Sequence, residues 1–419
     1  MKESNKKRFF IAMHYMEIGG AEISLVGLLQ ALDYSKYDVD LFIYSHQGEL
    51  IQFIPKEVNL LPEIPVYAHI ERPMKEALLA GHIRLVLARL KARWAFWKYL
   101  KKSGAQNSSA IFQYIANAVT PVLPSLCKDG EYDLAISFLT PHNIVMEKVR
   151  AKKKICWIHT DYSTIDVNAE LELPVWSAYD NIVAISEDAR NAFLKVFPSL
   201  EPKTMVMENI LSPDFVCQRA EEFEVNFNDN VNDNENPDEI KYINLLSVGR
   251  FCEAKNYDNV PDICKRIIAM LNENEDENEK VSVRWFLIGF GGDEALIREK
   301  IKEAGMENNV IILGKRSNPY PYIKACDIYV QPSRYEGKSV TVREAQMLCK
   351  PVVVTNYPTA SSQIQDGVDG VIVPLDNERC AKGIAEFILN RELQNKITNY
   401  LRTHDYGNEK EVEKLYKLI

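Results

Sequence analysis

The sequence lacks any uninterrupted apolar run of about 18 residues, the length that a membrane-spanning helix requires. The apolar run Phe9–Met13 after the basic N-terminus has five residues, which is too short for the core of a signal peptide. From these two absences we expect neither an integral membrane helix nor an export signal. We therefore expect a cytoplasmic protein.

The eight cysteines are scattered and form no C-x-x-C pair, and no two cysteines or histidines have the spacing of zinc ligands. In a chain long enough to bury a core without cross-links, such cysteines indicate a reducing compartment. The G-x-G-x-x-G fingerprint of dinucleotide-binding dehydrogenases is also missing. We expect neither a metal ion nor an organic cofactor.

The chain is too long for one hydrophobic core, since 419 residues exceed the roughly 250–300 at which a single core stops growing. Hydrophobic residues make up 46% of the sequence and charged residues 26%, as in a soluble globular protein. A formal net charge of -9 argues against nonspecific nucleic-acid binding. Two soluble domains are expected, without a nucleic-acid partner.

Short apolar runs alternate with helical patterns along the whole chain, which is typical of parallel sheets with helices on both faces. The predicted strands of the first half are Phe9–Met13, Val39–Tyr44, Leu134–Phe138, Lys154–Ile158 and Ile182–Ile185. Those of the second half are Ile243–Val248, Val283–Ile288, Val310–Leu313, Ile328–Val330, Val352–Thr355 and Val371–Val373. The predicted fold class is α/β, with two Rossmann-like domains and ligands beyond the carboxyl ends of the strands.

One segment interrupts this alternation. Residues 221–239 hold eight acidic residues, no basic ones and many asparagines. Such a stretch buries little apolar surface, so we interpret it as an exposed insertion, most simply a solvated spacer. The predicted boundaries are an N-terminal domain at 1–210, a linker with this insertion at 211–241, a C-terminal domain at 242–392 and a terminal helical segment at 393–419.

The most informative stretch is Asp327–Asn356, where a strand leads through a loop into a helix that begins near Ser339–Thr341. A helix N-terminus offers free N–H groups and a positive dipole end, which suit a diphosphate. Glu336 lies in the loop and Glu344 about one turn into the helix, where a carboxylate can accept the hydroxyls of a ribose. The alternative is that Thr341 and Glu344 form a capping box and only stabilise the helix.

Two cations follow another strand end, at Arg250 and Lys255 after Gly249. Arginine can bind a diphosphate through two hydrogen bonds and lysine acts as a point charge. No D-x-D metal motif is evident beside them, which suits a pair of cations in the role of a metal. The alternative is that they are two ordinary surface cations.

Three weaker signals also follow strands. A glycine turn contains Gly291, and a second one, Gly19 and Gly20, precedes a helix that could bring N–H groups to a phosphate. His159 follows the strand Lys154–Ile158, where it could hydrogen-bond a sugar, although an isolated histidine is more often structural.

The combination EGKSVTVRE after QPSRY, the segment SVGRFCEAKN and these glycine turns, in this order, resembles the retaining GT-B glycosyltransferases of family 4. The resemblance covers nearly the whole chain and is strongest over about 243–375. It implies two Rossmann-like domains that face each other across a cleft, with the N-terminal domain on the acceptor side and the terminal helix packed back on it.

The resemblance also implies the roles of the candidate residues. Glu336, Arg250, Lys255 and His159 would be catalytic. The donor-binding residues would be Gly19, Gly20, Gly249, Gly291, Lys338, Ser339, Val340 and Glu344.

The implied activity is metal-independent transfer of a hexose-type sugar, with retention, from a UDP- or GDP-sugar to a glycan or lipid-linked acceptor. Cell-surface polysaccharide biosynthesis is the expected setting. The alternatives are a non-catalytic nucleotide-sugar-binding subunit and a nucleotide-sugar epimerase on the same scaffold. A phosphorylase or a dehydrogenase fits less well, because neither a pyridoxal lysine nor the dinucleotide fingerprint stands out.

A basic amphipathic stretch occupies 82–102, inside a longer region, 77–127, that has no acidic residue. Its seven arginines and lysines alternate with leucines and two tryptophans. Two interpretations stay open: peripheral docking on the anionic inner face of the membrane, or an ordinary helix with its apolar residues on the sheet.

Overall fold

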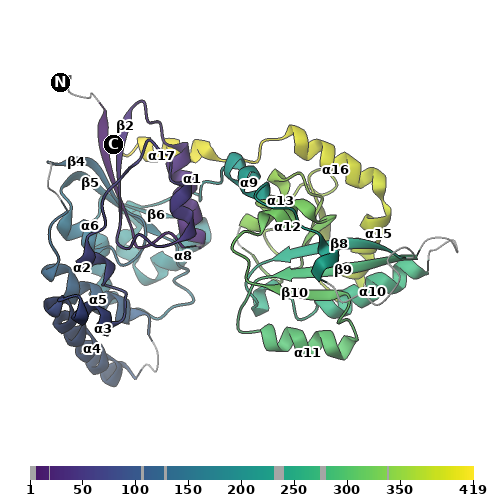
Figure 1. The fold of residues 1–419 in the computed structure, drawn as a ribbon, viewed down its shortest axis with the longest axis horizontal. Helices are drawn as coiled ribbons and strands as arrows, with labels where there is room; N and C mark the ends of the chain where they lie inside the picture. The colour runs from purple at the N-terminus through teal and green to yellow at the C-terminus, as the bar shows by residue number, and fades with distance from the viewer. Residues whose placement is uncertain are drawn as a thin grey trace. The chain divides into compact units, whose positions relative to one another are not determined.

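A computed structural model describes residues 6–17, 19–104, 108–126, 130–230, 240–273, 280–336 and 339–419 of the chain (Figure 1). The chain divides into two compact units. Unit 1 comprises Met1–Ser212 together with Asn408–Ile419, and unit 2 comprises Pro213–Gly407. The chain therefore passes from one unit to the other twice.

Unit 1 is built on a parallel sheet of seven strands in the order β3-β2-β1-β4-β5-β6-β7. Long buried runs such as FFIAM in β1 fit a sheet that helices cover on both faces. The strands are β1 (Lys7–Met13), β2 (Tyr37–Ile43), β3 (Asn59–Leu60), β4 (Tyr132–Ser137), β5 (Ala151–Ile158), β6 (Asn181–Ala184) and β7 (Thr204–Val206).

Unit 2 repeats this topology with six parallel strands in the order β10-β9-β8-β11-β12-β13. In both sheets the order reverses beside the first strand, which is the arrangement of a doubly wound Rossmann-like fold. The strands are β8 (Ile240–Val248), β9 (Lys280–Ile288), β10 (Val310–Gly314), β11 (Ile328–Gln331), β12 (Val352–Thr355) and β13 (Val371–Val373).

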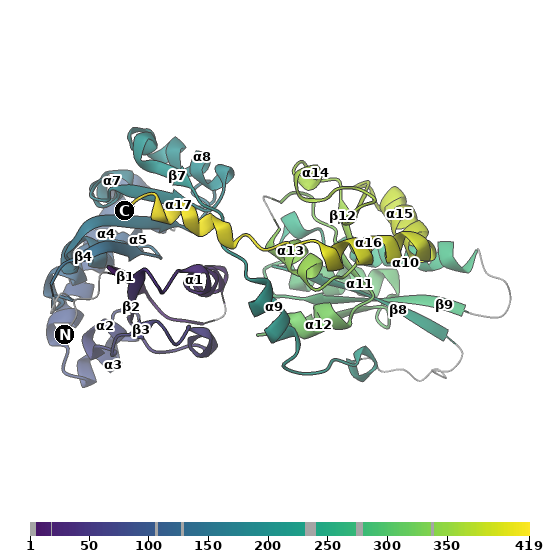
Figure 2. The same cartoon turned by 90° about the horizontal axis from the view of Figure 1, so that it is seen from above.

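Helices connect the strands in each unit (Figures 1 and 2). Side-chain caps fix several of them: Ser186 accepts the N–H of Ala189 at the start of α8, and Asp376 accepts that of Arg379 at the start of α15. Unit 1 holds α1 (Gly20–Ala31), α2 (Pro65–Ala68), α3 (Met74–Leu79), α4 (Ile83–Ser103), α5 (Ala110–Val119), α6 (Asn143–Lys148), α7 (Ala169–Ser177), α8 (Glu187–Val196) and α17 (Val412–Tyr416). Unit 2 holds α9 (Pro213–Ala220), α10 (Val260–Asn272), α11 (Glu294–Ala304), α12 (Tyr320–Ala325), α13 (Val340–Met347), α14 (Ala360–Gln363), α15 (Asn377–Leu389) and α16 (Arg391–Thr403).

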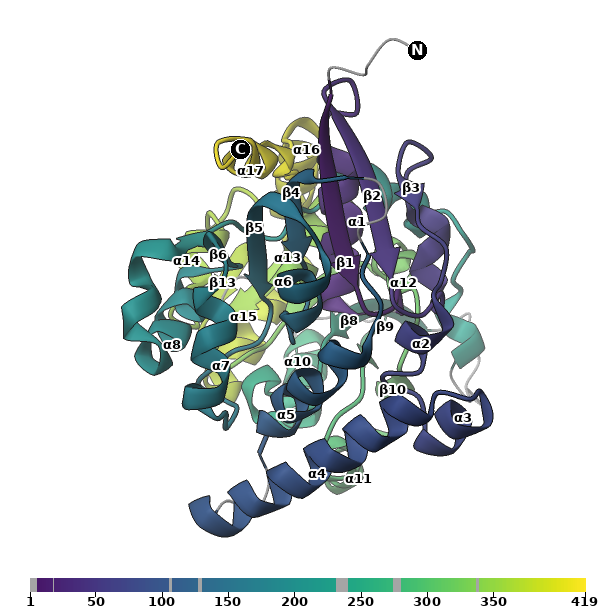
Figure 3. The ribbon, with the colours of Figure 1, turned by 90° about the vertical axis from the view of Figure 1, so that its left-hand side faces the viewer.

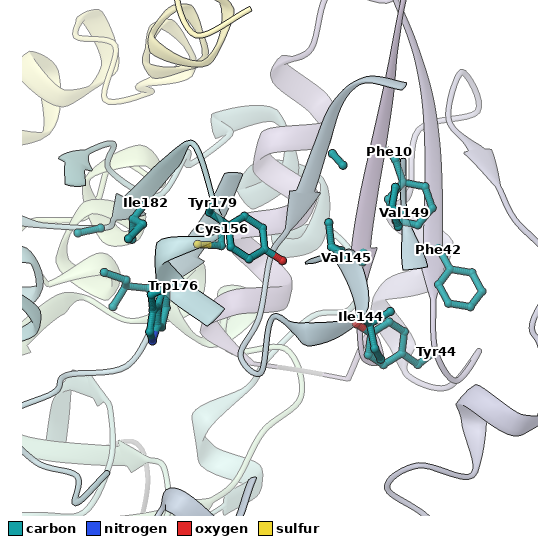
Figure 4. Packing of buried hydrophobic residues seen from close by; sticks show 14 of the residues in the cluster. Phe10, Phe42, Tyr44, Ile144, Val145, Val149, Cys156, Trp176, Tyr179 and Ile182 are labelled. Atoms are coloured by element: carbon teal, nitrogen blue, oxygen red, sulfur yellow. The ribbon is translucent and has the colours of Figure 1, made fainter. Parts of the chain in front are cut away.

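The core of unit 1 lies between the sheet and its covering helices (Figure 4). Alternate strand residues such as Phe10 and Phe42 pack there with Trp176 from α7. Burying aromatic side chains of this size contributes much of the free energy that holds sheet and helices together.

The predicted fold class is confirmed, because every predicted strand overlaps an observed one and all of the sheet pairs are parallel. The two strands that the sequence did not predict, β3 and β7, have only two and three residues, too few to show a hydrophobic period.

The acidic segment 221–239 is not simply a solvated spacer. Phe227 is buried in unit 2, where its ring lies 4.3 Å from that of Phe286. Glu221 forms an ion pair with Lys324 at 2.6 Å. Apolar anchors within an acidic stretch therefore order its first part, whereas residues 231–239 lie outside the described residues.

The unit boundaries also differ from the predicted segments. Residues 213–230, which we assigned to a linker, lie in unit 2, and so do residues 393–407 of the terminal segment. Only 408–419 pack in unit 1, where the Tyr416 hydroxyl accepts the N–H of Asp33 at 2.8 Å and its ring stacks on Tyr37.

No helix within the described ranges is long and apolar enough to cross a membrane. The seven cysteines in these ranges are all free, and Cys127 lies outside them.

Candidate active site

The main group of candidate residues lies at the point in unit 2 where the strand order reverses. β8 and β11 are neighbours in the sheet, so the loops that follow them leave the same edge side by side. Gly249, Arg250 and Lys255 belong to the first loop, and Glu336 belongs to the second. Such switch points are where open α/β sheets bind ligands.

Lys255 and Glu336 contact each other directly. Lys255 Nζ donates to Glu336 Oε1 at 2.6 Å, and the two side chains are 18% and 11% exposed. The same oxygen accepts from Ser333 Oγ at 2.6 Å and from Gln331 Nε2 at 2.9 Å. The carboxylate is therefore held in one orientation by three donors, so it is preorganised for a ligand.

Arg334 holds the two loops together, a role that the sequence did not reveal. Its guanidinium forms a two-pronged ion pair with Asp258 at 2.9 and 2.7 Å and donates to the carbonyl of Glu253 at 2.6 Å. Its own N–H donates to the carbonyl of Ala254. This bidentate ion pair holds the loop that carries Lys255 against the loop that carries Glu336.

The N-terminus of α13 begins after this loop. Ser339 is the N-cap residue, and its N–H donates to Gln363 Oε1 at 3.0 Å, so it is already paired. No side chain caps the helix, which leaves the N–H groups of its first turn, beginning with Val340, available to an anion. Lys338 and Gly337 lie outside the described residues.

Glu344 is buried in α13 and pairs with Tyr320, whose hydroxyl donates to Oε1 at 2.7 Å. Burial raises the pKa of Glu344 from 4.5 to about 7, although this hydrogen bond opposes the shift. The capping-box interpretation of Thr341 and Glu344 is not supported, because the helix begins at Val340 and Glu344 pairs elsewhere. Tyr320 had no signal in the sequence.

The glycines of unit 2 permit close approach of two loops. A Cβ at Gly291 would lie 2.2 Å from the carbonyl oxygen of Phe251, and one at Gly249 would lie 2.9 Å from the Tyr257 hydroxyl. Phe251 also bonds the adjoining turn, since its N–H donates to the carbonyl of Phe290. These contacts explain why glycine is required at both positions without a ligand.

Arg250 is exposed at the end of β8, and no ion pair joins it to the other residues that the structure describes. Its guanidinium therefore remains available to a ligand. The Lys255 ammonium is already paired with Glu336, so it can bind a ligand only by breaking that ion pair or by contacting both.

In unit 1, Gly19 and Gly20 stand at the start of α1, with Gly19 as the N-cap residue. The Glu22 carboxylate folds over this turn, and one of its oxygens would lie 2.2 Å from a Cβ at Gly19. Burial raises the pKa of Glu22. Nothing in the residue pattern predicts a buried acid here.

His159 follows β5 and is largely enclosed. Burial lowers its pKa to about 4, so the ring is neutral at physiological pH, and its ring lies 4.8 Å from that of Phe138. Nε2 is buried without a hydrogen-bond partner in the described structure. Asp161 does not orient this ring in the described contacts, because its carboxylate accepts from the N–H and hydroxyl of Ser163.

A cavity of about 610 Å³ lies within unit 1, at the carboxyl ends of β1, β2, β4 and β5. Its lining combines aromatic and aliphatic side chains with many polar ones. One is Glu172, whose pKa burial raises against hydrogen bonds from Trp176 and Tyr162. A hollow of this kind can hold an amphiphilic ligand.

His14 and Glu71 form a second polar pair in this cavity, with His14 Nδ1 2.6 Å from Glu71 Oε1. Partial burial disfavours the ionised carboxylate, but the hydrogen bond and the charge of His14 outweigh it and lower the pKa of Glu71. His14 follows β1 and stacks on Tyr44, whose ring lies 4.7 Å away, whereas Glu71 lies between α2 and α3. A histidine oriented by a carboxylate is a recurrent general-base arrangement.

Within the described ranges, no three His, Cys, Asp or Glu side chains group in a way that would hold a metal ion.

The two doubly wound units define a fold of the GT-B class. Staphylococcus aureus TarM, in a structure with UDP and carbohydrate ligands, superposes with a TM-score of 0.62 at 13% identity, covering 98% of this chain and 99% of that one. Anabaena HepE in complex with UDP and glucose gives a TM-score of 0.59 at 15% identity over 98% and 99%. Residues 229–404 match the family model described as Glycosyl transferases group 1.

Curated relatives agree with this assignment. An N-acetylgalactosaminyltransferase of Campylobacter jejuni that acts on a diphospho-undecaprenol-linked glycan is 27% identical over 161 residues, which cover 38% of this chain and 41% of that protein. The amylovoran biosynthesis glycosyltransferase AmsD of Erwinia amylovora is 22% identical over 287 residues, or 67% and 74% of the two chains. The expected GT-B fold is thus confirmed. The family model and these relatives are glycosyltransferases, although the chain spans less than half the length of the Campylobacter protein.

Proposed function

We propose that the protein transfers a hexose-type sugar, with retention of anomeric configuration, from a nucleotide diphosphate sugar to a lipid-linked or free glycan. Cell-surface polysaccharide biosynthesis at the cytoplasmic face of the membrane is the proposed setting. The observation that carries the proposal is the contact between Lys255 and Glu336 at the switch point of a family-matched unit.

The donor would bind in unit 2 with its diphosphate at the first turn of α13. Arg250 and Lys255 would neutralise the diphosphate, and Glu344 would accept hydroxyls of the ribose. In the free chain Lys255 pairs with Glu336, so donor binding draws the ammonium toward the phosphate. The freed carboxylate oxygen can then orient the donor sugar and stabilise positive charge that develops at its ring.

The proposed reaction is a front-face substitution that needs no metal. The bond between the anomeric carbon and the β-phosphate oxygen breaks, and the acceptor oxygen bonds to the same face of that carbon. The proton of the acceptor hydroxyl passes to the departing phosphate oxygen. The cations and the helix dipole stabilise the charge on the leaving diphosphate, which lowers the barrier.

A UDP-sugar is the first donor to test, because the HepE and TarM structures contain UDP. A lipid-linked glycan is the first acceptor, since the Campylobacter relative acts on one and AmsD serves the biosynthesis of a polysaccharide. We assign the acceptor to the cavity of unit 1, whose mixed apolar and polar walls suit a sugar attached to a lipid.

One observation favours a second mechanism. The pair of His14 and Glu71 lines the proposed acceptor cavity and could remove the proton of the acceptor hydroxyl. A general base that is separate from the leaving group permits attack from the opposite face, and the product would then be inverted.

Product stereochemistry separates these mechanisms. Purified enzyme is incubated with UDP- and GDP-sugars and a lipid-linked acceptor, and the anomeric configuration of the product is read by NMR. Retention supports front-face substitution, whereas inversion would remove it and favour the histidine pair. A bound but unconverted donor would indicate a non-catalytic binding subunit, and a donor converted to its epimer would indicate an epimerase.

A further inference from the structure

Helix α4 presents large apolar side chains to solvent. Its outward face carries what we call the apolar stripe: Ile83, Leu87, Leu90, Trp94 and Trp97, all between 48% and 61% exposed. They follow one another at intervals of four and three residues, which places them on one side of the helix. A contiguous apolar surface of this kind on a soluble fold marks a binding site.

The stripe is not needed for folding, because α4 packs through its opposite side. Leu85, Ala88 and Ala92 are buried there, and α4 runs along α3 and α5 (Figure 3). Of the two interpretations left open for 82–102, the one in which its apolar residues cover the sheet does not hold for the exposed tryptophans and leucines. Small and medium side chains form the packing face, and the two tryptophans point the other way.

Cations border the stripe along its length. Lys98 Nζ lies 3.4 Å from the centroid of the Trp94 ring, and Lys101 Nζ lies 3.7 Å from that of Trp97. Each ammonium therefore lies over the face of an indole ring in a cation–π contact, which places positive charge directly beside the apolar stripe. Other exposed cations on the helix are Arg84, Lys91, Arg93 and Lys102.

We propose that α4 lies on an anionic lipid surface, with the apolar stripe in the acyl boundary and its cations among the headgroups. Each cation near such a surface contributes electrostatic attraction, and the indoles favour the interface. The absence of any acidic residue between Ala77 and Cys127 leaves this attraction unopposed along the sequence.

The main competing occupant is a second copy of the chain. Intervals of four and three residues also suit a pair of helices. However, a symmetric pair would bring the cations of both copies together, with no acidic side chain on either helix to compensate. The charge pattern therefore favours the lipid surface.

The same helix contributes one residue to the lining of the cavity in unit 1. On its inner side, Arg89 lines the cavity and donates to the carbonyl of Arg72 at 2.6 Å. Phe112 on the neighbouring helix α5 lines the cavity and is also 64% exposed. Docking through α4 would thus bring the cavity close to membrane lipids. The docking itself stands whether or not the proposed transfer reaction is correct.

The first test is sedimentation of the full chain with vesicles of phosphatidylcholine alone or mixed with phosphatidylglycerol. We expect binding to the mixed vesicles that weakens as salt is added. Trp94→Gln combined with Trp97→Gln should lower the partition coefficient by about tenfold or more. The matched control is Lys382→Gln with Leu389→Gln on α15, which removes an exposed cation and an exposed apolar residue elsewhere.

The second test uses the tryptophans as probes, because Trp157, Trp176 and Trp285 are at most 2% exposed and give a constant background. Mixed vesicles should shift tryptophan emission to shorter wavelength and protect it from acrylamide. Trp94→Phe with Trp97→Phe should abolish this shift and keep most of the sedimentation.

Two results would overturn the proposal. One is recovery of the wild-type chain in the supernatant with anionic vesicles, or equal binding to both vesicle types. The other is a dimer in analytical ultracentrifugation that the Trp94→Gln, Trp97→Gln variant dissociates, without lipid binding by the wild type. Neither result depends on catalytic activity, so neither would disprove the proposed reaction.

Discussion

The contact between Lys255 and Glu336 couples two residues that the proposed reaction uses at different moments. Lys255→Ala and Glu336→Ala should each lower kcat by about 100-fold or more, because each removes stabilisation of charge in the transition state. The double variant should lose much less than the product of the two effects, since the residues act as a pair. Steady-state kinetics with a thermal melt for each variant checks this.

Arg298→Ala provides the matched control, because Arg298 pairs with Glu294 at 2.8 Å on the exposed side of α11. It should leave kcat within about twofold of the wild type. Near-normal turnover in Lys255→Ala or Glu336→Ala, with the fold intact, would contradict the assigned roles.

Glu344 should make donor binding depend on pH near neutrality. Its pKa in the folded chain is about 7, and an ionised carboxylate accepts hydrogen bonds from hydroxyls more strongly than a protonated carboxyl does. Donor affinity should therefore rise as pH increases through about 7. Calorimetric titration of UDP from pH 6 to about 8 measures it.

Glu344→Gln is the control, because it should bind UDP more weakly at high pH and lose this inflection. The free energy of unfolding changes with pH in the opposite direction. Because the pKa of Glu344 in the folded chain exceeds the reference value of 4.5, the wild type loses up to about 3 kcal/mol of stability as pH rises from 4.5 through 7. Glu344→Gln should therefore gain stability relative to the wild type at pH 8. An unchanged pH profile in the variant would assign the inflection to another group.

At the scale of residues, the sequence predicted that Glu336 and Lys255 lie in loops after strands, because the strands and the loop motifs occur in a recognisable order. It could not predict Tyr320 or Arg334, because their contacts join segments far apart in the chain and their residue types are ordinary. Nor could it tell whether Gly291 serves a ligand or a neighbouring loop, since both require glycine.

At the scale of elements, the relative position of the loops after β8 and β11 depends on the bidentate ion pair between Arg334 and Asp258. Arg334→Lys keeps the charge but cannot bind both oxygens of Asp258, so kcat/KM should fall by about tenfold. A double-mutant cycle with Asp258→Asn should give a coupling energy of about 1 kcal/mol or more in thermal unfolding. Additive effects would show that this ion pair does not position the loops.

The wall that α5 contributes to the cavity allows a separate test of the acceptor. Ala116→Phe adds bulk where Ala116 lines the cavity. We expect KM for the acceptor to rise by about tenfold, while the affinity for UDP, which we assign to unit 2, stays unchanged. An equal loss of affinity for the acceptor and for UDP would indicate that the fold is disrupted. An unchanged KM for the acceptor would indicate that the acceptor binds elsewhere.

Helix periodicity predicted α4 correctly as a helix, yet not which of its faces is outward. Both faces contain apolar residues, and the hydrophobic pattern alone cannot say which one meets the sheet. The buried position of Phe227 within the acidic segment was similarly hidden, because composition averages over single anchoring residues.

For the whole molecule, residues 408–419 should stabilise unit 1 selectively. Leu415 is fully buried there, and Asn408 and Glu411 accept the N–H groups of Leu211 and Glu208. Truncation after Gly407 should destabilise unit 1 by about 2–4 kcal/mol. Hydrogen exchange should accelerate in α1 and β2 and stay unchanged in β8 and β9.

Lys417→Ala, at the end of this segment, is the matched control for Tyr416→Ala, which removes the stacking on Tyr37 and the bond to Asp33. Only the tyrosine variant should accelerate exchange in unit 1. Equally accelerated hydrogen exchange in both units would mean that the two units unfold together.

The double passage of the chain has a consequence for proteolysis. A protease that cuts once close to Ser212 yields two fragments, and the C-terminal fragment carries the twelve residues 408–419 that pack in unit 1. The nicked enzyme should therefore migrate as one particle under native conditions and separate only in denaturant. The C-terminal residues 408–419 would then hold the two fragments together without a covalent bond.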